Sequence, residues 1–154
     1  MLVVSSALHQ LAAVVWVGGM FFAYLVLRPA LAELAPAARL AVWQAVFGSF
    51  FRWVGAAIAV LFATGYALVF GGWGGFADVG LHVHLMHGLA LVMLAVFVAL
   101  VHGPWRRFRA AKAAGDDTGA AAALGGIRRL VAINLALGLV TTVLGASGRW
   151  WIAA

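Results

Sequence analysis

Four long apolar runs constrain the fold of this chain more than any other feature of its sequence. They cover roughly residues 2–27, 53–70, 81–101 and 127–146. Each is close to the ~20 apolar residues that an α-helix needs to cross the ~30 Å hydrocarbon core of a bilayer. The sequence therefore predicts an all-α integral membrane protein, with residues 1–154 forming a single up-and-down four-helix bundle.

The composition agrees with a membrane protein and limits its chemistry. Hydrophobic residues make up 66% of the chain and charged residues 9%, and the mean hydropathy is +1.09; soluble domains carry about 25% charged residues. There is no cysteine, which excludes disulfides, iron–sulfur clusters and thiolate metal sites. The first run lacks a basic start and a cleavage motif, so we expect it to remain as a helix rather than be removed as a signal peptide.

The basic residues predict the topology. Nine of the ten lie between the first and second runs or between the third and fourth: Arg28, Arg39, Arg52, Arg106, Arg107, Arg109, Lys112, Arg128 and Arg129. Such a bias assigns those two loops to the cytoplasm. Both termini would then face the outer, periplasmic side of a bacterial inner membrane. The net charge of +6 does not indicate nucleic acid, because the basic residues are confined to these loops and form no groove lined with stacking aromatic residues. The expected partner of the apolar helices is membrane lipid.

Prolines and polar residues predict where the helices end. We expect the first helix to end near Arg28-Pro29 and the third to close at His102-Gly103-Pro104, because proline disfavours helix at the residue before it. Residues 37–51 either extend the second helix beyond the bilayer or lie along its surface. The composition of residues 110–123 predicts a polar, alanine-rich connector between the third and fourth helices.

Histidines gather at the outer ends of the first and third helices. His9 lies about seven residues into the first helix, and His82, His84 and His87 open the third. These two helices run in the same direction, so His9 and either His84 or His87 should lie at similar depth. Ionisable side chains are costly in a membrane and usually mark a functional site. Facing helices of a bundle can supply both axial ligands of a haem, so we predict b-type haem.

The choice between His84 and His87 as the axial ligand depends on which residues follow each histidine on the same face of the helix. Gly88 and Ala95 follow His84 and would leave room for a porphyrin, whereas Leu94 follows His87 and fills space. We therefore favour His9 and His84 as axial ligands and keep His87 as the alternative. Two imidazoles saturate the iron, so electron transfer is the expected chemistry, with a quinone or another redox protein as partner.

Other residues complete the predicted site. Trp16 and Gly88 would line the pocket, and Arg149 would pair with haem propionates or anchor the interface. His82, near the interface, would be hydrated or bond a propionate.

Two further hypotheses for the function of the chain stay open. The first is a copper site that uses His9, His82, His84 and His87, because imidazole suits copper. Two-residue spacing on a helix puts His82 and His84 about 160° apart, which disfavours three ligands from one helix. The second is a structural partner subunit without chromophore or metal, and in either case the chain could form a homo-oligomer.

The first helix carries a recognisable pattern. His9, Trp16, Gly18-Gly19 and Arg28-Pro29 resemble the opening of the CopD (copper-resistance D) family domain. The stretch from Leu81 to His102-Gly103 is similar to the third helix of the related HemJ-type protoporphyrinogen oxidases, which carry a lysine at the position of His84. The resemblance implies a four-helix membrane protein, with copper handling on the CopD side. On the HemJ side it implies b-type haem and porphyrinogen oxidation, which would make the chain an oxidoreductase.

Overall fold

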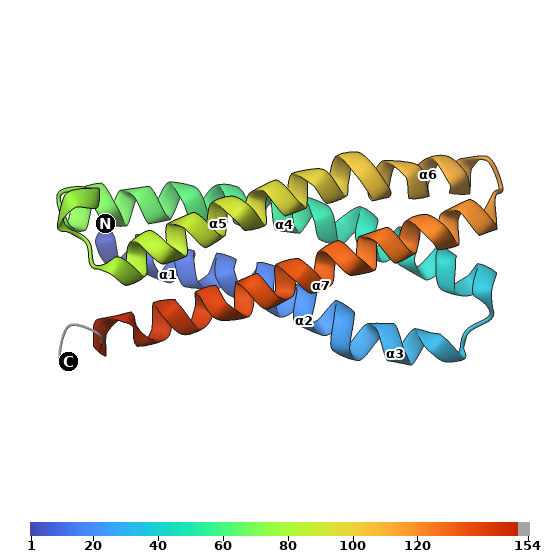
Figure 1. The fold of residues 1–154 in the computed structure, drawn as a ribbon, viewed down its shortest axis with the longest axis horizontal. Coiled ribbons are helices and arrows are strands. Elements are labelled where there is room, and N and C mark those ends of the chain that lie inside the picture. Colours follow the sequence, from blue (N-terminus) through green and yellow to red (C-terminus); the bar gives the residue numbers. More distant parts are fainter. Residues whose placement is uncertain (151–154) are drawn as a thin grey trace.

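Four long helical spans make up the protein. The computed structural model describes residues 1–150, apart from the side chain of Arg149. The spans are Leu2–Glu33, Pro36–Gly72, Leu81–Ala113 and Asp117–Ser147, numbered first to fourth here (Figure 1). Each is long and apolar enough to cross a membrane. The predicted all-α architecture with four membrane helices is therefore confirmed.

The second and fourth spans are unbroken, whereas the first and third contain π-helical segments. The first span consists of α1 (Leu2–Ala13), a π-helical segment (Val14–Gly18), α2 (Gly19–Phe21), a second π-helical segment (Phe22–Leu27), α3 (Arg28–Ala30) and a 3-10 turn (Leu31–Glu33). The second span is α4 (Pro36–Gly72). A 3-10 turn (Phe76–Asp78) precedes the third span, which consists of α5 (Leu81–Leu100), a π-helical segment (Val101–Trp105) and α6 (Arg106–Ala113). The fourth is α7 (Asp117–Ser147), followed by a 3-10 turn (Gly148–Trp150).

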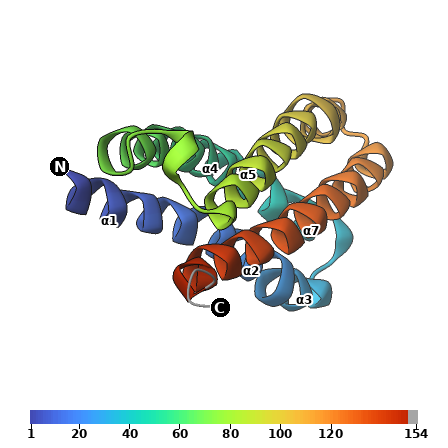
Figure 2. The same ribbon diagram turned by 60° about the vertical axis from the view of Figure 1, so that its left-hand side comes forward.

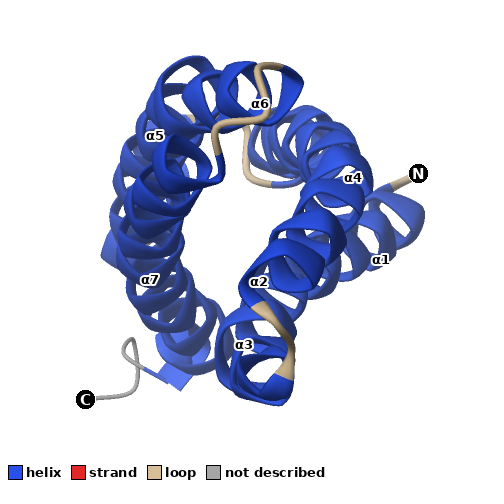
Figure 3. Cartoon of the chain, turned by 90° about the vertical axis from the view of Figure 1, so that its right-hand side faces the viewer, coloured by secondary structure: helices blue, strands red, loops and turns tan. Residues whose placement is uncertain are grey.

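The spans run up and down along one long axis. The turns at residues 34–35 and 114–116 lie at one end, and Met1, the loop 73–80 and residues 148–150 lie at the other (Figure 1). We call the first end, which carries nine of the ten basic residues, the basic end, and the other the histidine end. Helix α1 packs along α4, and α5 packs along α7 (Figure 2). Viewed end-on, these two pairs face each other across the bundle (Figure 3).

The helices extend further toward the basic end than the sequence predicted. The expected ends at Arg28-Pro29 and at His102-Gly103-Pro104 were wrong, because helical structure continues to Glu33 and to Ala113. Pro29 is the second residue after a π-helical segment, and Pro104 lies inside one. A wider π-helical turn leaves room for the proline ring, which would otherwise clash with a carbonyl in the preceding turn. Residues 37–51 extend α4, and the predicted connector is helical on both sides of a turn at Gly115.

Small residues let the two helix pairs approach closely. A Cβ atom at Gly138 of α7 would lie 2.9 Å from a methyl group of Val17 and 3.1 Å from the terminal methyl of Met93. Nearby, the amide of Asn134 donates a hydrogen bond to the backbone oxygen of Met93 at 3.2 Å. Membrane helices associate through such close packing and interhelical hydrogen bonds, because lipid supplies no hydrophobic force between them. Gly138 is therefore a contact point of three spans.

A larger side chain at this point should weaken the bundle. We expect Gly138→Leu to destabilise the folded state by about 1–3 kcal/mol through overpacking against Val17 and Met93. Gly125→Leu is the matched control, since Gly125 is an exposed glycine of the same helix with nothing within 4 Å of its Cβ position. The measurement is the midpoint of SDS-induced unfolding of the detergent-solubilised proteins. Equal midpoints for the two variants would contradict the packing assigned to Gly138.

Candidate functional site

Helix α4 holds the imidazole of His9 from one side. The Nδ1 atom of His9 lies 3.1 Å from the backbone oxygen of Leu61 and 3.0 Å from Oγ1 of Thr64. The Thr64 hydroxyl is 2.6 Å from the backbone oxygen of Val60, to which it donates. Both partners of Nδ1 therefore accept, so Nδ1 carries the proton. The Nε2 atom keeps its lone pair and has no hydrogen-bond partner in the described part of the chain.

This arrangement is the one that metal-binding histidines use. Their second ring nitrogen commonly donates to a backbone carbonyl or a carboxylate, which fixes the tautomer and the ring orientation. A glycine on α4 provides the room, because a Cβ atom at Gly65 would lie 3.3 Å from Cε1 of His9. His9 is thus oriented and deprotonated at the nitrogen that could bind a metal.

His87 lies at the same level of the bundle but in an aromatic cluster. Its ring centroid is 5.1 Å from that of Phe76, 5.6 Å from that of Tyr66 and 6.3 Å from that of Phe62. Residues 62 and 66 belong to the turn of α4 whose residues 61, 64 and 65 contact His9. His9 and His87 therefore flank one turn of α4, on neighbouring faces of that helix.

The other two histidines at the start of α5, His82 and His84, contact other residues. The exposed His84 stacks loosely on Phe76, with ring centroids 6.0 Å apart. His82 packs onto Gly148 beyond the end of α7. Within residues 1–150, no group of three or more His, Cys, Asp or Glu side chains is placed to hold a metal ion. The described residues of the histidine end therefore form no three-ligand cage.

The remaining predicted pocket residues are divided between two places. A Cβ atom at Gly88 would meet no other atom within 4 Å, so this position faces open space beside the histidines. Trp16 is buried nearer the basic end, where it lines a small hollow with Val54 and Asn134. Among the described residues, the Trp16 Nε1 donor and the Asn134 Oδ1 acceptor have no hydrogen-bond partner. The side chain of Arg149 lies outside the described part of the structure.

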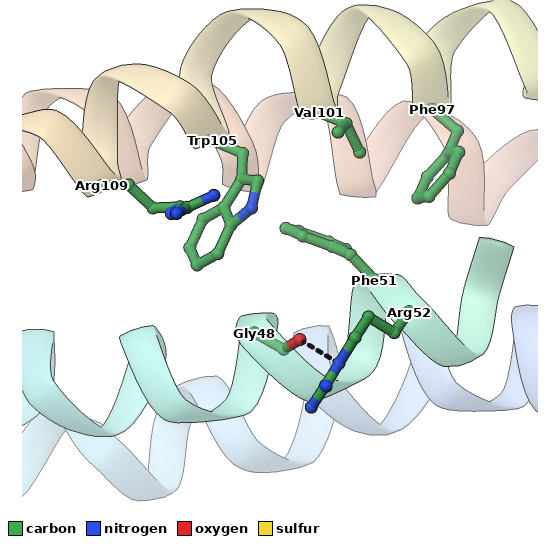
Figure 4. Close-up of a pocket in the computed structure, with 7 residues that line it drawn as sticks. All are labelled: Gly48, Phe51, Arg52, Phe97, Val101, Trp105 and Arg109. Atoms are coloured by element: carbon green, nitrogen blue, oxygen red, sulfur yellow. Dashed lines mark hydrogen bonds between the residues drawn. The ribbon is translucent and has the colours of Figure 1, made fainter.

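A second feature was not anticipated from the sequence. A groove of about 460 Å³ runs between α4 and the third span near the basic end (Figure 4). Its lining is Gly48, Phe51, Arg52, Phe97, Val101, Trp105 and Arg109. The sequence does contain a signal for this groove: Phe51 and Arg52 directly precede the second apolar run, and Trp105 and Arg109 follow the third. The pairing of these two stretches could be known only from the fold.

The tautomer of His9 can be tested directly. We expect neutral His9 to carry its proton on Nδ1, because both neighbours of that atom are acceptors. Nitrogen NMR of protein labelled in its histidine side chains measures this, with His9→Gln assigning the signals. A resonance pattern with the proton on Nε2 would contradict the assigned hydrogen bonds.

Comparison with known sequences places the chain in a family. The sequence model of the family described as copper resistance protein D matches residues 44–147. Neither the curated proteins nor the solved structures include a significant match. The match confirms the expected CopD family, but it does not include residues 9–29, on which the resemblance was based. The HemJ-type relation stays a prediction. The matched region includes residues 44–72 of α4, the third span with its histidines, and all of α7. The chain is therefore a member of the copper resistance protein D family, with four helices that can span a membrane.

Proposed function

We propose that this protein binds copper at the histidine end of its membrane domain. The observation that carries the proposal is the geometry of His9, whose Nδ1 is held by Leu61 and Thr64 so that Nε2 is free to bind a metal. The family description supports copper as the metal. In a bacterial inner membrane with the predicted topology, this end would face the periplasm.

The available donors suit a small coordination number. His9 and His87 flank the same turn of α4, and the exposed His84 lies one helical turn further toward the end of the bundle. Structural zinc sites use four protein ligands, which this end does not assemble. Imidazole is a good copper ligand, so a pair of histidines supplemented by an external donor is the chemistry that fits.

The polar groups in the middle of the bundle favour copper binding over copper transport across the membrane. The hydroxyls of Thr141 and Thr142 lie 2.9 Å and 2.8 Å from backbone oxygens of their own helix, to which they donate. The Asn134 amide is bonded to Met93 across the bundle. Between the histidines and His102 these groups offer no series of free ligands. We therefore assign copper binding to this protein, and not copper conduction in the described conformation.

The second candidate is a b-type haem protein with His9 and either His84 or His87 as axial ligands. The observation that favours it is the open space at the exposed Gly88, which lies one helical turn after His84. A bound haem would supply one-electron exchange with a quinone or another redox partner. His9 would then act as an oriented axial ligand, with its proton held on Nδ1 by α4.

One experiment separates the two candidates. The detergent-purified protein is examined by absorption spectroscopy with a pyridine haemochrome assay, and by metal analysis after equilibration with Cu⁺ and Cu²⁺. We expect bound copper, lost in His9→Ala and reduced in His84→Ala or His87→Ala. His102→Ala is the matched control, because His102 is an exposed histidine near the basic end.

The outcomes are distinct. A b-type spectrum that disappears in His9→Ala would replace copper by haem. A protein with neither chromophore nor copper, isolated from haem-sufficient cells, would refute both. Copper retained equally by His9→Ala and His102→Ala would refute the site.

The support that α4 gives to His9 provides a finer test. We expect Thr64→Val to weaken copper binding about tenfold, at the lower limit of the 10–100-fold typical of lost outer-shell partners, because the Leu61 carbonyl remains. Thr142→Val is the matched control, since that hydroxyl bonds only within α7. The readout is a competition titration with a chelator. Equal affinities for the two variants would show that α4 does not orient a ligand.

A further inference from the structure

The groove between α4 and the third span lies apart from the histidine end. It is about 460 Å³ in volume and contains no histidine in its lining (Figure 4). Phe51 and Arg52 contribute from α4, and Phe97, Trp105 and Arg109 from the third span. Its lining therefore combines aromatic rings with two guanidinium groups, and it is formed by two spans that are otherwise mainly apolar.

The aromatic surface of the groove is rigid. The rings of Phe51 and Trp105 meet edge to face at 5.4 Å, and those of Phe51 and Phe97 at 6.2 Å. Phe51 is 8% exposed and Trp105 is 9% exposed, so the two rings are fixed in the core and present only one side to the groove. A flexible apolar chain could lie against this surface without any rearrangement of the protein.

The two arginines are not neutralised by the protein. Arg52 donates from Nε to the backbone oxygen of Gly48 at 3.0 Å and from Nη2 to the Ser49 hydroxyl at 3.4 Å, both uncharged partners. Arg109 is exposed and forms no ion pair with another described residue. The ion pair of residues 1–150 joins Lys112 to Asp117. Two positive charges therefore flank the groove without a carboxylate.

The depth of the groove matches the boundary of the hydrocarbon. Gly72 at the end of α4 is 20 residues from Arg52, and ~20 helical residues cross the ~30 Å core. On the third span, Val101 ends the apolar run and Trp105 and Arg109 follow it. Arg52 and Arg109 thus lie at the level of lipid headgroups, while Phe97 lies among the acyl chains.

We propose that this groove is a binding site for an anionic phospholipid. The phosphate lies between Arg52 and Arg109, and one acyl chain lies along Phe51, Phe97 and Val101. Basic pockets between membrane helices recognise acidic lipid headgroups, and phosphate pairs strongly with arginine. The apolar surface continuous with the membrane distinguishes a lipid from a soluble phosphate as the occupant. This proposal is independent of the metal chemistry at the histidine end.

Native mass spectrometry of the full-length protein in detergent tests the site. The protein is titrated with phosphatidylglycerol and with phosphatidylcholine of the same acyl chains, and the ratio of the two affinities is measured. We expect a preference for phosphatidylglycerol that falls about fivefold in Arg52→Gln and about fivefold in Arg109→Gln. Arg107→Gln is the matched control, because Arg107 points away from Arg109 on the same helix and does not line the groove.

Additional measurements make the test decisive. Circular dichroism of each variant shows that the bundle is intact, and Phe97→Ala should weaken both lipids equally because it removes only apolar contact. An unchanged preference in the Arg52→Gln, Arg109→Gln double variant would overturn the proposal, as would an equal loss in Arg107→Gln. Displacement of the lipid by millimolar glycerol phosphate would also overturn it, in favour of a site for soluble anions.

Discussion

The structure depends on one constraint: within a membrane, every backbone N–H and C=O must find its partner inside the protein. Four continuous helical spans meet this constraint, and they meet it even where the sequence contains a helix breaker. Pro29 and Pro104 are accommodated by π-helical segments, which shift the hydrogen-bond pattern without ending the helix. The same adjustment places Arg109 on a helical continuation of α5, where it lines the groove beside α4.

Close contacts between the spans then decide which side chains meet. Gly65 lets the His9 ring lie against α4, and Gly138 lets α7 approach Val17 and Met93. These contacts have little sequence signature beyond the glycine itself. They nevertheless fix the tautomer of His9, because Nδ1 reaches Leu61 and Thr64 only when α1 packs along α4.

The sequence predicts the number, type and apolar centres of the helices, because hydropathy reports the thickness of the hydrocarbon directly. It does not predict their ends, since a helix can continue beyond its apolar run while its backbone hydrogen bonds are favourable, as α4 does from Pro36 to Arg52. It identifies the histidines as candidates but not their neighbours. His87 is surrounded by Phe62, Tyr66 and Phe76, which come from two other segments. The groove of Arg52 and Arg109 likewise requires a helix pairing that periodicity does not encode.

The two ends of the bundle carry different functional groups, and the described residues between them form no series of free ligands. Imidazoles gather at one end and guanidinium groups at the other, while the polar side chains between them are largely bonded to backbone oxygens. Trp16 and Asn134 belong to a hollow lined by residues of all four spans. Among the described residues, the Nε1 atom of Trp16 and the Oδ1 atom of Asn134 have no hydrogen-bond partner. A shift of one helix pair against the other would change this hollow first, because the pairs meet there. Any influence of the lipid groove on the histidines would therefore have to pass through helix movement, and not through a chain of ligands.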